Sequence, residues 1–344
     1  MKLSWKQFDL HLRHAFRISR GVEIVDPVMI VSFEHDGIAG FGEASPTPRY
    51  HETIETVAAF LKRVDLSRFD DPFQTEDILL YVQSLTPVGS PLGENTSAKC
   101  AVDIALHDWI GKKLNVPLYK LLGLDKSKTA LSSFTIGIDS PDMLIKKIRE
   151  AEEYPVLKIK LGMENDRETI KTIRSATDKV LRVDANEGWT TKELALERIK
   201  WLQDENVEFV EQPMPAAQLD DMKWLRAKIT MPLIADENVI GLRDIPKLGD
   251  AFDGINIKLM KCTGIREAVR MIHTARAMNM KIMMGCMIET AVAISAAAHL
   301  SPLLDYADLD GNVLITDDPF DGVRNVRGKL ELNDKPGLGV VLRN

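Results

Sequence analysis

The chain repeats one pattern from about residue 130 to about residue 308. A short apolar segment is followed by a segment whose apolar residues recur at helical spacing, seven times over, and a last apolar segment ends near Ala307 and Asp308. Parallel strands need crossover helices, so the repeat predicts an α/β fold, most simply a (β/α)7β TIM-like barrel. The predicted strands are LSSFTIGI, VLKIKLG, KVLRVDA, VEFVEQP, PLIADEN, GINIKLM and KIMMGCM. The predicted helices span 142–153, 166–176, 192–203, 218–228, 243–248, 264–278 and 289–300.

Residues 1–125 have a different organisation. LSWKQFDLHL alternates like a strand, and VMIVSFEHDGIAGFGEA predicts a hairpin closed at Asp36-Gly37. Helical patterns follow at 51–63, 75–84 and 97–113. We therefore expect an α+β domain over 1–125 and a barrel domain over 126–319. The tail 320–344 is expected to pack back on the first domain as short strands and loops.

Composition excludes several classes of partner. The chain has 344 residues, a net charge of -7 and no basic stripe, which argues against nucleic acid. The most apolar segment, 291–304, is interrupted by Ser, His and Pro and is too short to span a bilayer, and no signal peptide is expected. Cys100, Cys262 and Cys286 form no CxxC pair, which predicts a reducing, cytoplasmic location.

Carboxylates stand at the ends of three successive predicted strands. They are Asp184 in VDAN, Glu211 in VEQP and Asp236 in ADEN. The carboxyl ends of barrel strands carry the chemistry, and three converging negative charges would repel one another. Any one of them alone is more simply a salt-bridge partner or a helix N-cap. Three in a row predict a hard divalent cation, and oxygen ligands with room for water or substrate suit Mg²⁺.

Lysines accompany these carboxylates. In VLKIKLGM, Lys158 and Lys160 share one face of an otherwise apolar strand, and Lys258 ends the sixth strand in NIKLMK. Lys160 and Lys258 would face each other across the barrel mouth, with the metal between them. We expect neighbouring positive charge and partial burial to lower a lysine pKa toward that of a general base. Two bases on opposite faces of a carbon could invert a stereocentre. Lys258 alone, like Lys261, would be read as solvated or ion-paired.

These motifs, in this order, resemble the enolase superfamily in its muconate-lactonizing-type subgroup. The resemblance also includes GFGEA and AVDIALHDWIGKKLNVPLYKLLG, and it covers nearly the whole chain. It implies a capping domain at the N-terminus and a barrel that binds one Mg²⁺. The implied roles are metal binding by Asp184, Glu211 and Asp236, acid/base catalysis by Lys160 and Lys258, and electrostatic stabilisation of the substrate carboxylate by Lys158.

Within the subgroup the chain is similar to dipeptide epimerases of the L-Ala-D/L-Glu type. The signals are GCMIET at the seventh strand and DLDG at the eighth. The resemblance implies that Asp308 and Asp310 bind the α-amino group of a dipeptide, although DLDG alone is also typical of a turn. Thr135, Cys286 and Ile288 would contact the dipeptide. The resemblance also implies that the chain acts on peptides derived from bacterial cell walls and that it could form a homo-oligomer.

The side-chain specificity is left open by the sequence. The family commonly places an Arg in the loop after the first strand, but here that loop reads FRISRGVEIVDP, with Gly21 to Glu23 at the matching place. Arg20 and Arg49 are the two alternatives for receiving a Glu side chain. If neither does, the second residue differs, and Glu23 could suit a cation or simply lie at the surface. His51, on a second covering loop, could reach the substrate.

Other reactions use the same scaffold. An o-succinylbenzoate synthase or a muconate-type cycloisomerase would employ the same lysines and metal, but Asp308 and Asp310 favour a substrate with an amine. An acid-sugar dehydratase would need a histidine base at the far strands, and the seven histidines do not fall there. A non-enzymatic binding protein would not need the intact set of ligands and bases.

Overall fold

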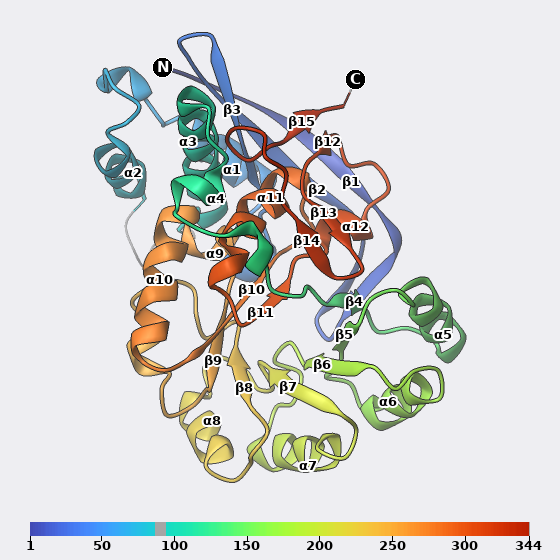
Figure 1. Cartoon of the computed structure of the whole chain (residues 1–344). Helices are drawn as coiled ribbons and strands as arrows, with labels where there is room; N and C mark the ends of the chain where they lie inside the picture. The colour runs from blue at the N-terminus through green and yellow to red at the C-terminus, as the bar shows by residue number, and fades with distance from the viewer. Residues whose placement is uncertain (87–93, 344) are drawn as a thin grey trace.

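The N-terminal part is built on an antiparallel sheet. The computed structural model describes residues 1–86 and 94–343, and Figure 1 shows this sheet in blue. Its strands are β1 (Lys2–Ile18), β2 (Gly21–His35) and β3 (Ile38–Ala44). The predicted turn at Asp36-Gly37 is confirmed, and both residues have positive φ (50° and 73°), as a two-residue hairpin turn requires.

The segment FRISRGVEIVDP is strand rather than loop. β1 continues to Ile18 and β2 starts at Gly21, with Phe16 opposite Glu23 and Ile18 opposite Gly21. The prediction of a loop was wrong, because the β-branched residues on both sides favour extended pairing and leave only Ser19 and Arg20 to turn. Arg20 therefore stands at the tip of a long hairpin.

Three helices pack with this sheet, namely α1 (Ile54–Leu61), α2 (Thr75–Ser84) and α3 (Thr96–Leu114). They confirm the predicted helical segments. α3 lies directly on β3, where a Cβ atom on Gly42 would stand 1.9 Å from the carbonyl oxygen of Ala101. The glycines of GFGEA are thus explained by close backbone approach.

The predicted barrel is confirmed. Eight parallel strands follow one another in chain order around a nearly closed sheet, and the first and last are joined by a bridge between Ser132 and Ala307. The strands are β4 (Phe134–Ile136), β5 (Val156–Lys160), β6 (Val180–Asp184), β7 (Val207–Glu211), β8 (Leu233–Ala235), β9 (Gly254–Ile257), β10 (Lys281–Gly285) and β11 (Tyr306–Asp308).

Helices connect the strands on the outside of the barrel (Figure 1). They are α5 (Pro141–Glu150), α6 (Asp166–Arg174), α7 (Lys192–Leu202), α8 (Leu219–Arg226), α10 (Ile265–Ala277) and α11 (Ala291–Leu300). The helix predicted at 243–248 is only a 3₁₀ turn, Ile245–Lys247. Its second residue is Pro246, which has no N–H for a continuing helix, and glycines bracket the segment. A short helix, α9 (Leu259–Cys262), follows β9 directly.

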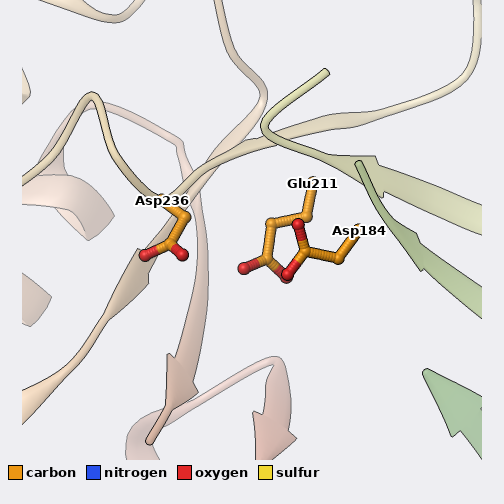
Figure 2. Close-up of side chains that lie close together, drawn as sticks. All are labelled: Asp184, Glu211 and Asp236. Atoms are coloured by element: carbon orange, nitrogen blue, oxygen red, sulfur yellow. The ribbon is translucent and has the colours of Figure 1, made fainter. Parts of the chain in front are cut away.

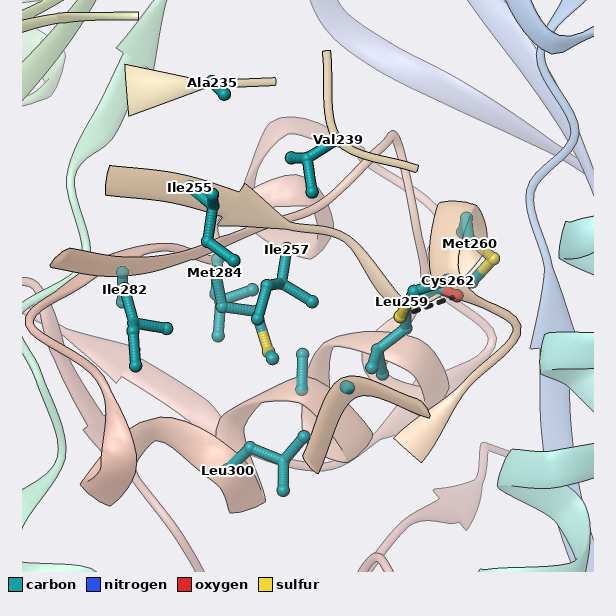
Figure 3. Packing of buried hydrophobic residues seen from close by; sticks show 14 of the residues in the cluster. Ala235, Val239, Ile255, Ile257, Leu259, Met260, Cys262, Ile282, Met284 and Leu300 are labelled. Carbon is teal, nitrogen blue, oxygen red and sulfur yellow. Dashed lines mark hydrogen bonds between the residues drawn. The ribbon is translucent and has the colours of Figure 1, made fainter. Parts of the chain in front are cut away.

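Alternation along the barrel strands separates the core from the site. Figure 3 shows Ile255 and Ile257 of β9 packed with Ile282 and Met284 of β10. Asn256, between the two isoleucines, is fully buried on the opposite face of β9 and bonds across the barrel interior to Glu211. The apolar face therefore holds the helices, and the other face is free to carry polar groups.

The C-terminal tail forms short strands, β12 (Phe320–Asp321) with β15 (Val341–Leu342) and β13 (Arg324–Val326) with β14 (Lys329–Glu331). Asp108 of α3 accepts hydrogen bonds from the backbone N–H of Leu338 and of Phe41, both at 2.8 Å. The tail thus contacts α3 and β3, while the boundaries at 125 and 319 stay a prediction. Among the helices of 1–86 and 94–343, none combines the length and apolar character needed to cross a bilayer.

Candidate active site

Lys158 and Lys160 of β5 point into the barrel mouth. The Nζ of Lys158 lies 2.8 Å from Glu211 Oε2, 2.8 Å from Asp308 Oδ2 and 3.2 Å from Asp184 Oδ2. The Nζ of Lys160 lies 2.7 Å from Asp184 Oδ2. Both side chains are buried, so two cations in an apolar strand are explained by the carboxylates that they face.

The three predicted metal ligands converge. Asp184 ends β6, Glu211 ends β7 and Asp236 follows β8, and one oxygen of each lies within 4.8 Å of the others. Figure 2 shows the three carboxylates turned toward a common point. All three are buried. A set of hard oxygen donors from three adjacent strands fits Mg²⁺.

The charges of this cluster are strongly coupled. Burial, together with Asp184, raises the pKa of Glu211 to about 7. Burial acts in the same direction on Asp236, but Lys258 and Lys261 outweigh it and hold the pKa of Asp236 well below its ordinary value. A divalent cation between the carboxylates would relieve the repulsion between Glu211 and Asp184.

Lys258 lies across the mouth from Lys160. It follows β9 and caps α9, and its Nζ is 2.9 Å from Asp236 Oδ2. β5 and β9 are four strands apart in an eight-stranded barrel, so the two lysines come from opposite sides. The expected lowering of the lysine pKa is wrong for Lys258. Burial does act to lower it, but the directly bonded carboxylate of Asp236 raises the pKa of Lys258 above its ordinary value.

Two buried residues that contact the carboxylates were not predicted as part of the site. The Nζ of Lys261 is 2.5 Å from Asp236 Oδ1, and Asn256 Nδ2 donates to Glu211 Oε1 at 2.8 Å. Lys261 is therefore ion-paired, the second of the two ordinary roles considered for it, and is not solvated. Asn256 stands two residues before Lys258, and this spacing on a strand could have indicated a shared face.

Asp308 and Asp310 meet the first strand where the barrel closes. Asp308 Oδ1 accepts a hydrogen bond from Ser133 Oγ at 2.7 Å, and Asp310 Oδ2 accepts one from the backbone N–H of Thr135 at 2.6 Å. Burial, together with the negative charge of the neighbouring Asp308, raises the pKa of Asp310 to about 7. Asp308 and Asp310 thus form an acidic wall of the site at the seam between β11 and β4.

A cavity of about 410 Å³ lies over these groups. The structure brings most of the predicted substrate-contacting and catalytic residues to its wall, namely Arg20, Glu23, Arg49, Thr135, Lys158, Lys160, Lys258, Cys286, Ile288, Asp308 and Asp310. His51 is exposed beyond the 3₁₀ turn Pro48–Tyr50 and does not belong to the lining found among the described residues.

Two arginines close one side of the mouth. Arg20 Nη1 is 2.7 Å from Glu237 Oε1, and Arg49 forms two 2.9 Å hydrogen bonds with the carboxylate of Glu187. Arg20 Nη1 also donates to the carbonyl oxygen of Asn186 at 2.9 Å. Both guanidinium groups thus have carboxylate partners within the protein.

Both parts of the chain are similar to known proteins. Residues 7–123 match the family model described as "Mandelate racemase / muconate lactonizing enzyme, N-terminal domain", and residues 143–344 match "Enolase C-terminal domain-like". A protein of Bacteroides thetaiotaomicron named L-Ala-D/L-Glu epimerase is 50% identical over 342 residues, covering 99% of this chain and 88% of the relative.

Two solved structures are similar over almost the whole chain. A substrate-liganded L-Ala-D/L-Glu epimerase from Bacillus subtilis has a TM-score of 0.92 at 28% identity, covering 99% of this chain and 98% of the other. A dipeptide epimerase from Enterococcus faecalis, complexed with Mg and L-Leu-L-Tyr, has a TM-score of 0.89 at 33% identity, covering 98% of each chain.

Proposed function

The chain belongs to the mandelate racemase and muconate lactonizing enzyme family of the enolase superfamily and is an epimerase, and we propose that it inverts the α-carbon of the C-terminal residue of a dipeptide, with Mg²⁺ as its cofactor. The observation that carries the proposal is the pair Lys160 and Lys258 on opposite sides of one carboxylate cluster. Relatives named as dipeptide epimerases support the substrate class.

The two lysines act as a base and an acid on opposite faces of the substrate. A neutral lysine on one face takes the α-proton, so that the C–H bond breaks, an N–H bond forms and the substrate carboxylate becomes an enediolate. The protonated lysine on the other face then returns a proton to the same carbon. Lys158, fully buried beside Glu211 and Asp184, supplies fixed positive charge for the negative charge that develops on the substrate.

Asp184, Glu211 and Asp236 would hold Mg²⁺. When bound, the ion stabilises negative charge on the substrate carboxylate. The donor set supports this assignment, since three buried carboxylate groups from successive strands offer hard oxygen ligands that lie within 4.8 Å of one another.

Asp308 and Asp310 would receive the α-amino group of the dipeptide. A cationic amine matches the acidic wall that these residues form with Thr135, and Cys286 and Ile288 line the same cavity. Neither o-succinylbenzoate synthesis nor muconate cycloisomerisation has a substrate with an amine, so this wall favours the dipeptide over both.

Arg20, Glu23 and Arg49 are proposed to face the side chains of the dipeptide, because all three line the cavity. The partners of the two arginines indicate that they also hold the hairpin tip and the second covering loop against the barrel. A cytoplasmic setting is part of the proposal and is supported by three free cysteines, two of them buried.

The first experiment is proton exchange in D₂O with Mg²⁺, followed by NMR. The panel contains L-Ala-L-Glu, L-Ala-L-Leu, L-Ala-L-Lys and N-acetylated L-Ala-L-Glu. We expect loss of the α-proton signal of the C-terminal residue and appearance of the diastereomer for at least one free dipeptide. Absence of exchange with every dipeptide refutes the proposal and makes the o-succinylbenzoate precursor the next compound to assay.

Two variants test the roles of the lysines. Lys160→Ala and Lys258→Ala should each lose epimerisation by at least about 10³-fold, near 4 kcal/mol in barrier, since one face lacks its acid or base. Each variant should keep exchange from one epimer only, and the two variants should keep opposite epimers. Exchange from both epimers in either variant contradicts the two-base scheme.

A further inference from the structure

Lys261 is a buried lysine that the proposed reaction does not use. Its ammonium group donates to Asp236 Oδ1 at 2.5 Å, to the carbonyl oxygen of Asp236 at 2.7 Å and to that of Asn256 at 3.2 Å. Only 1% of the residue is exposed. Three acceptors match the three ammonium hydrogens, which a buried cation needs to offset its desolvation. The geometry of Asp236 and its surroundings is therefore fixed by this contact.

The two carboxylate oxygens of Asp236 have different partners. Oδ1 bonds to Lys261, and Oδ2 bonds to Lys258 at 2.9 Å. Lys258 lines the cavity, so Oδ2 is the oxygen on the cavity side. Oδ1 is already occupied by a fully buried cation that cannot swing away into solvent.

The same ammonium group reaches the support of a second carboxylate. It bonds to the carbonyl oxygen of Asn256, whose side chain donates to Glu211 Oε1 at 2.8 Å. Gly285 of β10 makes room for this amide, because a Cβ atom there would stand 2.8 Å from Asn256 Nδ2. Lys261 thus contacts both Asp236 and Asn256, the residue that orients Glu211.

We propose that Lys261 is a positioning residue that limits Asp236 to one oxygen in cation binding and so favours Mg²⁺ over Ca²⁺. The inference rests on the proposed Mg²⁺ site. Mg²⁺ requires near-ideal octahedral geometry and small ligands, whereas Ca²⁺ takes more oxygens and accepts both oxygens of one carboxylate. With Oδ1 held by Lys261, Asp236 cannot offer both.

The test measures the dissociation constants of Mg²⁺ and of Ca²⁺ by titration calorimetry, without substrate. Lys261→Met removes a positive charge beside the site, which affects both divalent ions alike and cancels in their ratio. The ratio of the Ca²⁺ constant to the Mg²⁺ constant should fall at least fivefold. Lys147→Met is the matched control and should leave the ratio unchanged. Lys147 is another buried lysine, which lies on α5 and pairs with Asp139 at 2.9 Å.

The outcomes separate this inference from the proposed function. A ratio within twofold of wild type in folded Lys261→Met overturns the inference and leaves the Mg²⁺ site standing. A wild-type protein that binds neither ion overturns the site and the inference together. If Lys261→Met does not fold, Lys261→Gln, whose neutral side chain is one atom shorter, should show the same shift, read from how far each ion raises the unfolding temperature.

Discussion

Glu43 of β3 links the N-terminal sheet to the barrel through a carboxyl group with no access to water. It accepts hydrogen bonds from the backbone N–H of Thr290 at 2.8 Å, from the Thr290 hydroxyl at 2.6 Å and from the backbone N–H of Ala293 at 3.0 Å. These contacts cap the N-terminus of α11. Burial, which these hydrogen bonds only partly oppose, raises the pKa of Glu43 from 4.5 to about 7.

The raised pKa of Glu43 makes the stability of the folded protein depend on pH. Between pH 4.5 and 7 the folded protein keeps a proton on Glu43 that the unfolded chain releases, so the free energy of unfolding falls as the pH rises through this range. The full loss is about 3 kcal/mol, at 1.36 kcal/mol for each pH unit. Glu43→Gln cannot ionise. The free energy of unfolding of Glu43→Gln minus that of wild type should therefore increase by about 3 kcal/mol from pH 4.5 to 7.5, because only the wild-type value falls through this group.

Urea unfolding, followed by circular dichroism at several pH values, measures this difference. Other buried carboxyl groups titrate in both proteins and cancel in the comparison. Glu34→Gln, at an exposed site on β2 of the same sheet, is the control and should give a curve parallel to wild type. Curves for Glu43→Gln and wild type that stay parallel to within about 0.5 kcal/mol would refute the reasoning.

Three further predictions concern the site. Glu211→Gln removes one proposed ligand, so Mg²⁺ at about 100 times the wild-type Kd should stabilise wild type by about 2.7 kcal/mol and the variant by less than about 1 kcal/mol, measured by thermal unfolding with and without chelator. Asp310→Asn should reduce the preference in kcat/KM for a free over an N-acetylated dipeptide at least tenfold, because the amine loses an acceptor charge; an unchanged preference contradicts its role. Arg49→Met should change the free energy of unfolding by less than about 1 kcal/mol, since its pair with Glu187 is partly exposed. It should lower kcat/KM at least tenfold more for L-Ala-L-Glu than for L-Ala-L-Leu, because Arg49 is proposed to face the dipeptide side chains, and equal losses for the two dipeptides would contradict that role.

The barrel and its site were predictable because both follow from periodicity. Short apolar segments alternating with helical ones can form few other folds, and the strand ends then place Asp184, Glu211 and Asp236 side by side. Lys158 and Lys160 were recognisable because two cations on one face of an apolar strand need partners.

What escaped prediction depends on distances that a sequence does not contain. The pKa of Lys258 was expected to fall, but the nearest charge proved to be a carboxylate oxygen at 2.9 Å. Lys261 follows Lys258 by one helical turn, and its direction depends on α9, which starts at Leu259. The residues on both sides of the hairpin tip at Arg20 were expected to lie in a loop, because cross-strand pairing is not visible in a single segment.

The closing strand of the barrel also sets an order of events in synthesis. β11 carries Asp308 and is followed by Asp310, and these residues bond to Ser133 and Thr135 at the seam between the last and first strands. A growing chain makes β4 long before β11, so the seam stays open, and the acidic wall absent, until more than 300 residues have been joined. The hydrogen bond from Leu338 to Asp108 of α3 forms later still, although α3 is made early. The nascent chain therefore closes its barrel and completes the acidic wall of the candidate site at nearly the same moment.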